Sequence, residues 1–116
     1  MADKVIHAEV VGKDGAALQR FYADLFDWNF DTNNPGGYGI APSSENGVAT
    51  GVGDATPPGS AGWVTFYVGL SSVDDALAKA EKLGGKVIVP KFSPGPNAVL
   101  GMFADPEGHV IGVTEL

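Results

Sequence analysis

The spacing of apolar residues changes along the chain, and the same order of changes occurs twice. Runs of β-branched and aromatic residues, typical of strands, are each followed by apolar residues three and four positions apart, typical of an amphipathic helix. Short apolar runs separated by glycine- and proline-rich turns follow each helix. The pattern predicts helices at 14–26 and 73–83, and strands at 5–11, around Trp28, and at 38–41, 47–52, 63–68, 86–89, 98–103 and 110–115.

The two predicted helices carry signals for their ends and their packing. Asp14 and Ser72 are placed as N-caps, and Gly84-Gly85 ends the second helix. The first helix has one apolar stripe, which we expect to pack against the core of the domain. The stripe consists of Leu18, Phe21, Tyr22, Leu25 and Phe26.

One stretch, GDATPPGSAG at 53–62, has no apolar periodicity, and its composition is typical of a linker. The element order β-α-β-β-β precedes it and follows it, although the two halves are not alike in sequence. We therefore expect one domain over 1–116, with a first module at 1–54, the linker at 53–62 and a second module at 63–116.

Composition narrows the functional classes. A chain of 116 residues is one domain by length. Seven basic against fourteen acidic residues give a net charge of −7, which repels phosphate backbones, so we expect no nucleic-acid partner. No apolar run approaches the ~20 residues of a membrane helix, and the first residues lack a signal-peptide core, so we expect a cytoplasmic protein without a membrane partner. The absence of cysteine excludes disulfides, thiolate metal sites and cysteine nucleophiles.

Two motifs give the chain a resemblance to a known superfamily. The first is His7 on a strand followed by RFYADLFDW at 20–28, and the second is FADPEGHVIG at 103–112. In this order, with a helix-Gly-Gly-strand unit between them, they resemble the vicinal oxygen chelate superfamily of glyoxalase I, bleomycin-resistance proteins and extradiol dioxygenases. The resemblance implies an α+β fold of two βαβββ modules, with curled mixed sheets around a cavity, and a homodimer. His109 lies beside the DPEG turn, where we expect it to face solvent.

The same resemblance identifies where a metal would be held. Metal-using members take ligands from the first and last strand of each module, commonly two histidines and two carboxylates. The corresponding positions here are His7, the strand 47–52, Thr65 and Gly112. Only His7 is a good ligand, and Glu115 lies on the strand face opposite to Gly112. Since catalytic zinc sites use about three protein ligands, we expect no metal or other cofactor. A divalent metal held by His7 and unidentified ligands is the alternative.

Alternation along the strands predicts a candidate small-molecule site. His7 and Glu9 share one face of the first strand, whose other face is wholly apolar and suits packing under a helix. The corresponding face of the strand 63–68 carries Trp63, Thr65 and Tyr67. An imidazole, a carboxylate, a hydroxyl and two aromatic rings suit a ligand pocket. The alternative is that His7 and Glu9 bond only each other or the backbone.

Three functions follow from these observations. The first is a glyoxalase/bleomycin-resistance/dioxygenase-family protein that binds a small aromatic or apolar molecule in its cavity without a metal. The second is a metal-dependent glyoxalase-type lyase or ring-cleaving dioxygenase, with His7 as a ligand and Glu9 as a base. The third is a structural or interaction module. The substrate is not encoded in these patterns, because one fold hosts many chemistries.

Overall fold

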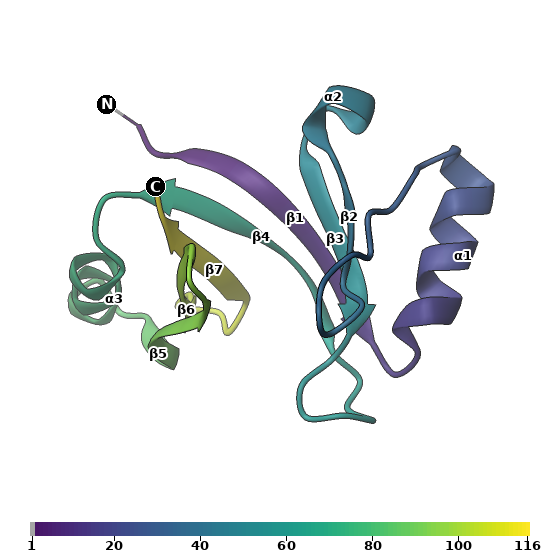
Figure 1. Ribbon diagram of the computed structural model, residues 1–116. Helices are drawn as coiled ribbons and strands as arrows, with labels where there is room; N and C mark the ends of the chain where they lie inside the picture. The colour runs from purple at the N-terminus through teal and green to yellow at the C-terminus, as the bar shows by residue number, and fades with distance from the viewer. Residues whose placement is uncertain (1) are drawn as a thin grey trace. The chain divides into compact units, whose positions relative to one another are not determined.

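A computed structural model describes residues 2–116, leaving out the side chains of residues 45 and 46 (Figure 1). The chain forms two compact units, one of residues 7–64 and one of residues 65–116 together with the start of the chain up to Ile6. The predicted α+β fold class with mixed sheets is confirmed. The elements are β1 (Lys4–Gly12), α1 (Gly15–Phe26), β2 (Gly39–Ala41), α2 (Ser43–Asn46), β3 (Ala49–Asp54), β4 (Trp63–Leu70), α3 (Val73–Lys82), β5 (Lys86–Gly95), β6 (Ala98–Ala104) and β7 (Val110–Glu115).

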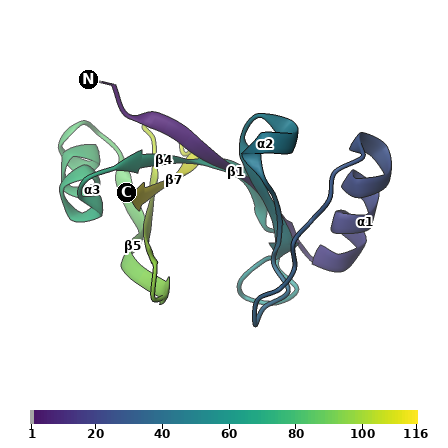
Figure 2. The same ribbon diagram turned by 45° about the horizontal axis from the view of Figure 1, so that its top comes forward.

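In the unit of residues 7–64, the strands lie in the order β2-β3-β1. β1 runs parallel to β3, with Glu9 opposite Gly51, and β2 runs antiparallel to β3. Figure 2 shows α2 as a short helix where the chain passes from β2 to β3. The apolar pattern predicts no helix between the strands at 38–41 and 47–52. β3 runs to Asp54 and β4 starts at Trp63, so the connecting loop comprises residues 55–62.

α1 begins where its predicted capping residue places it. The Asp14 carboxylate accepts a hydrogen bond from the Ala17 N–H at 3.0 Å. At the other end Asp27 adopts a left-handed conformation, with φ of 62°, and its N–H bonds the Ala23 carbonyl. α1 is held to β3 by Asp54, whose carboxylate accepts from the Gly15 N–H at 2.6 Å.

The expectation that the whole apolar stripe of α1 packs in the core is wrong. Phe21 and Leu25 are each 58% exposed and Phe26 is 51% exposed. Helical spacing determines which residues share a face, but it does not determine what covers that face. The aromatic members instead contact one another and Trp28, with ring centroids 5.1 Å apart for Phe26 and Trp28. We call this surface the aromatic patch, consisting of Phe21, Tyr22, Leu25, Phe26 and Trp28.

The strand expected around Trp28 does not form. α1 ends at Phe26 and the chain turns at residues 34–36, so few residues are left to pair. Pairing is limited to an isolated bridge between Asp31 and Ile40. The first module therefore matches the predicted βαβββ order only in part.

The second unit has the complete β-α-β-β-β order, with strands arranged β4-β7-β6-β5. β4 pairs with β7 in parallel, and the other neighbours are antiparallel. α3 covers the sheet through Val73 and Leu77, which are buried with Val113 of β7. The Ser72 hydroxyl caps α3 by accepting from the Asp75 N–H at 3.1 Å, as predicted. β5 extends to Gly95, beyond its predicted end at Val89. Among the described residues, no helix is long and apolar enough to cross a membrane.

Candidate functional site

Four side chains of the unit 7–64 form one hydrogen-bonded group, which we call the Tyr38 cluster: His7, Glu9, Tyr38 and Trp63. The Tyr38 hydroxyl donates to Glu9 Oε1 at 3.0 Å and lies 2.8 Å from His7 Nε2. Because the single phenolic proton goes to Glu9, His7 Nε2 carries the proton in their shared bond. The indole Nε1–H of Trp63 donates to Glu9 Oε2 at 2.8 Å. Both oxygens of the Glu9 carboxylate therefore have donors.

Tyr38 reaches this place because β3 lacks side chains there. A Cβ atom on Gly51 would lie 1.5 Å from the Tyr38 hydroxyl oxygen, and one on Gly53 would lie 2.9 Å from the ring. Gly51 is the residue opposite Glu9 in the β1–β3 register. The Asn34 side chain fixes the backbone of Tyr38, accepting from its N–H at 3.0 Å and donating to its carbonyl at 2.7 Å. The phenol thus fills the space that a side chain of β3 would occupy.

Sequence reasoning missed Tyr38, although a signal was present. Gly51 and Gly53 stand two residues apart, so they lie on the same face of β3 and leave it bare. Glycine inside a strand often marks a close approach by another group. The aromatic residue that follows the Gly36-Gly37 pair was a candidate for that group.

Burial sets the protonation state of His7. Its pKa lies below the usual 6.5, chiefly because burial penalises the charged imidazolium, while the negative charge of Glu9 opposes the shift. His7 is therefore neutral at neutral pH. A neutral ring has one N–H, which agrees with Nε2 donating to Tyr38.

This lowered pKa predicts a pH-dependent stability. The unfolded chain binds a proton at His7 more readily than the folded chain, so the contribution of neutral His7 is fully present above pH 6.5. It is lost as pH falls through the folded pKa. Urea unfolding followed across this range should give a smaller loss of stability in His7→Asn than in wild type, with His109→Asn as the exposed-histidine control. Identical pH profiles for wild type and His7→Asn would contradict the prediction.

The other two predicted site residues lie in the second unit. The Thr65 hydroxyl is buried and donates to the Val110 carbonyl oxygen at 2.7 Å. Tyr67 is also buried, and its ring covers Gly112, where a Cβ atom would come within 2.3 Å of it. Within the unit 7–64 the structure therefore brings together His7, Glu9 and Trp63. Thr65 and Tyr67 belong to the other unit, where they contact Val110 and Gly112.

His109 forms its contacts within the DPEG turn, at residues 105–108, and these contacts explain its position without a bound ligand. The His109 side chain is 69% exposed, as predicted, and its Nδ1 lies 2.9 Å from Asp105 Oδ2. Hydrogen bonds from the backbone and side chain of His109 and from the Glu107 backbone lower the pKa of the Asp105 carboxyl. The pair holds the turn between β6 and β7 together.

The residues at the superfamily's metal positions do not fit a metal ion. His7 bonds Tyr38, the Thr65 hydroxyl donates to the Val110 carbonyl oxygen, and Gly112 lies under an aromatic ring. Glu115 accepts from the Val73 N–H at 3.0 Å, at the start of α3, on the face opposite to Gly112 as alternation predicts. Among the side chains that the structure describes, no three from His, Cys, Asp or Glu gather in a group that could hold a metal.

Comparisons with known proteins place the chain in a family. Residues 9–114 match the family described as the glyoxalase-like domain. The protein named Putative glyoxylase CFP32, of Mycobacterium bovis and Mycobacterium tuberculosis, is 33% identical over 107 residues, which are 86% of this chain and 41% of the relative. The chain thus spans less than half the length of these curated relatives.

Solved structures agree at the level of the fold. A glyoxalase/bleomycin resistance protein/dioxygenase superfamily member from Vibrio splendidus has a TM-score of 0.62 at 16% identity, with 98% of each chain covered. A methylmalonyl-CoA epimerase in complex with methylmalonyl-CoA has a TM-score of 0.64 at 14% identity, with 99% of this chain and 95% of that chain covered. The family match over residues 9–114 shows that this chain belongs to the glyoxalase-like family of the vicinal oxygen chelate superfamily, and these structures share its fold.

Proposed function

We propose that this protein binds a small aromatic or apolar molecule beside the Tyr38 cluster, without the metal that other superfamily members use. The observation that carries the proposal is the bond from the Trp63 indole to Glu9. One edge of the indole is held by the carboxylate, and the same side chain lines a pocket of about 330 Å³. A polar group that orients an aromatic wall is typical of small-molecule sites.

Within this site the members of the cluster have different roles. Glu9 is a positioning residue, because its two oxygens fix both Tyr38 and Trp63. Neutral His7 supports Tyr38 from the other side. These hydrogen bonds would also form if the cluster served only to stabilise the fold. The proposal therefore requires that a substitution in the cluster weakens ligand binding more than it weakens folding.

The alternative is a metal-dependent glyoxalase-type lyase or ring-cleaving dioxygenase that uses His7 and unidentified ligands. It draws on the glyoxylase name of the curated relatives. Elemental analysis of the purified protein separates the two functions, because the alternative requires about one Zn, Ni, Mn or Fe ion per chain.

His7→Ala tests both functions in one variant. We expect the variant still to fold and to bind ring compounds more weakly, by up to roughly 1–3 kcal/mol, since Tyr38 loses a partly buried hydrogen-bond partner and then holds Glu9, and through it Trp63, less firmly. Binding is measured by ¹H–¹⁵N NMR with a set of uncharged aromatic fragments, and His109→Ala is the control. A stoichiometric metal that is lost in His7→Ala, with EDTA reproducing the effect, would refute the metal-free proposal.

We further propose a homodimer in which a second copy covers the aromatic patch. Phe21 and Leu25 are more than half exposed in the single chain, which leaves a large apolar surface in water. Light scattering should give twice the chain mass of 11.9 kDa for the wild type. The double variant Phe21→Asp/Leu25→Asp should be monomeric. Val64→Asp, at a 77% exposed apolar position that is not part of the aromatic patch, should leave the mass unchanged. A monomeric wild type would refute the proposal.

A further inference from the structure

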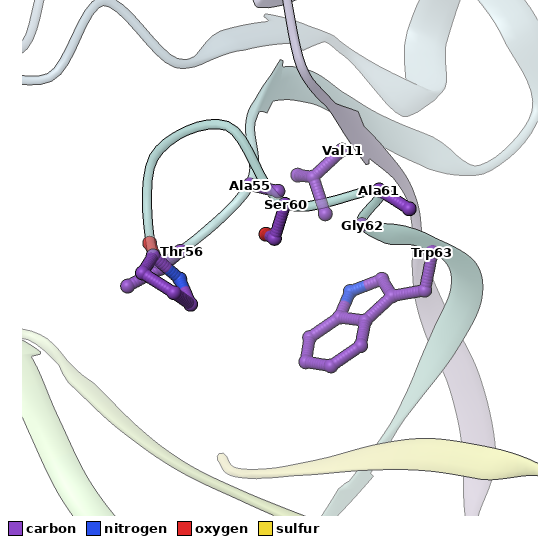
Figure 3. A pocket seen from close by; sticks show the side chains of 8 residues that line it. Val11, Ala55, Thr56, Ser60, Ala61, Gly62 and Trp63 are labelled. Atoms are coloured by element: carbon purple, nitrogen blue, oxygen red, sulfur yellow. The ribbon is translucent and has the colours of Figure 1, made fainter.

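The pocket beside Trp63 is formed by the loop between β3 and β4 and the end of β1. Figure 3 shows Trp63 and Thr56 on either side of it, with Ser60 between them. We call it the Trp63 pocket. It is lined by Val11, Ala55, Thr56, Pro57, Ser60, Ala61, Gly62 and Trp63. Its volume of about 330 Å³ is at the lower end of the range of known ligand pockets.

The loop is anchored to β1 at both ends, which makes the pocket a preformed one. At its start, the Ala55 N–H donates to the Gly12 carbonyl oxygen at 2.8 Å. At its end, Gly62 packs so tightly on Val11 that a Cβ atom would lie 1.8 Å from the Val11 carbonyl oxygen. A preformed wall needs no ordering when a ligand enters, which favours binding.

The middle of the loop is a tight turn. The residues Pro57-Pro58-Gly59-Ser60 are closed by a hydrogen bond from the Ser60 N–H to the Pro57 carbonyl oxygen at 3.1 Å. Gly59 has φ of +85°, the value that a type II turn requires at its third position, and proline suits the second. This turn fixes the backbone of Ser60, one of the residues that line the pocket.

The chemistry of the lining defines the ligand class. No lining residue is charged, and most of the side chains are aliphatic or aromatic. The exception that matters is Ser60, whose buried hydroxyl oxygen has no hydrogen-bond partner among the described residues. A buried polar group without a partner is costly, so a ligand that supplies one is favoured. A charged ligand would be disfavoured by the apolar lining.

We propose that the Trp63 pocket binds an uncharged ring compound with one hydrogen-bonding oxygen, which stacks on the Trp63 indole and accepts from the Ser60 hydroxyl. This inference rests on the proposed function, since it names the ligand class of the same site. Glu9 then acts on the ligand only through the orientation of Trp63.

Three probes of similar shape test this assignment on the full ¹⁵N-labelled chain: acetophenone, which has a ring and a carbonyl; ethylbenzene, which has only the ring; and benzoate, which is charged. ¹H–¹⁵N NMR follows the amides of residues 55–62 and the Trp63 indole N–H, which Trp28→Phe identifies by elimination. Acetophenone is expected to shift these signals, and benzoate at the same concentration is expected to leave them in place. Ser60→Ala should weaken acetophenone binding roughly 2- to 12-fold and leave ethylbenzene binding unchanged. Ser44→Ala, at an exposed serine of α2, is the matched control.

The possible results separate this inference from the proposed function. Equal acetophenone affinity in Ser60→Ala and wild type would refute the proposed hydrogen bond from the Ser60 hydroxyl to the ligand. Shifts confined to the amides of His7, Glu9 and Tyr38, with the signals of residues 55–62 unchanged, would show that the ligand does not bind in the Trp63 pocket. They would still support the proposed function. If no probe moves any signal of residues 7–64, both the inference and the proposed function fail.

Discussion

Gly51→Ala is expected to lower the free energy of unfolding by roughly 2–4 kcal/mol, although it adds only one methyl group. The added Cβ would lie 1.5 Å from the Tyr38 hydroxyl oxygen and 2.0 Å from the ring carbon that bears it. Tyr38 must therefore leave its place, and its bonds to His7 and Glu9 are lost with it. Urea unfolding followed by circular dichroism measures the change.

Two controls make this prediction specific. Gly36→Ala adds a methyl group whose nearest neighbour is 3.9 Å away, so it should change the free energy of unfolding by less than about 0.5 kcal/mol. In a Tyr38→Ala background, Gly51→Ala should cost much less than in the wild type, because the obstructing ring is gone. An equal cost in both backgrounds would show that Tyr38 does not lie over Gly51.

Gly62→Ala is expected to have an effect of similar size, about 3 kcal/mol, because two penalties act at one residue. Gly62 has φ of +73°, a conformation that costs an L residue about 1–2 kcal/mol. In addition, the new Cβ would lie 1.8 Å from the Val11 carbonyl oxygen, which is backbone and cannot rotate away. The loop must separate from β1, so binding of acetophenone in the Trp63 pocket should also be lost.

Gly59→Ala is the matched control for Gly62→Ala. Gly59 also has a positive φ, +85°, but nothing lies within 4 Å of a Cβ atom there. It should therefore show the conformational penalty alone, about 1–2 kcal/mol. Comparable losses of stability for the two variants would contradict the close contact of Gly62 with Val11.

The sequence by itself determined the elements whose signals are local. Asp14 and Ser72 cap their helices as predicted, because an N-cap bonds a backbone N–H only three residues ahead. Strand alternation correctly placed Gly112 and Glu115 on opposite faces, since it depends on the strand alone. The two motifs around 20–28 and 103–112 were sufficient to identify the superfamily, which the family match confirms.

Only the tertiary structure decided which side chains meet. Strand alternation grouped Trp63 with His7 and Glu9 in one candidate site, but it could not show that the indole bonds Glu9, 54 residues away. Tyr38 is 31 residues from His7 and 29 from Glu9, so no local pattern links it to them. Their meeting depends on the β1–β3 register, which puts Gly51 opposite Glu9 and leaves room for the phenol.

The same distinction explains the error over α1. Apolar spacing showed that Phe21, Leu25 and Phe26 share a face, and the structure shows that this face is exposed within the chain. The period of a helix is a local property of its backbone, whereas the burial of a face depends on which distant segment packs against it. The strand around Trp28 failed for the same reason, because a strand needs a partner of sufficient length as well as a suitable sequence.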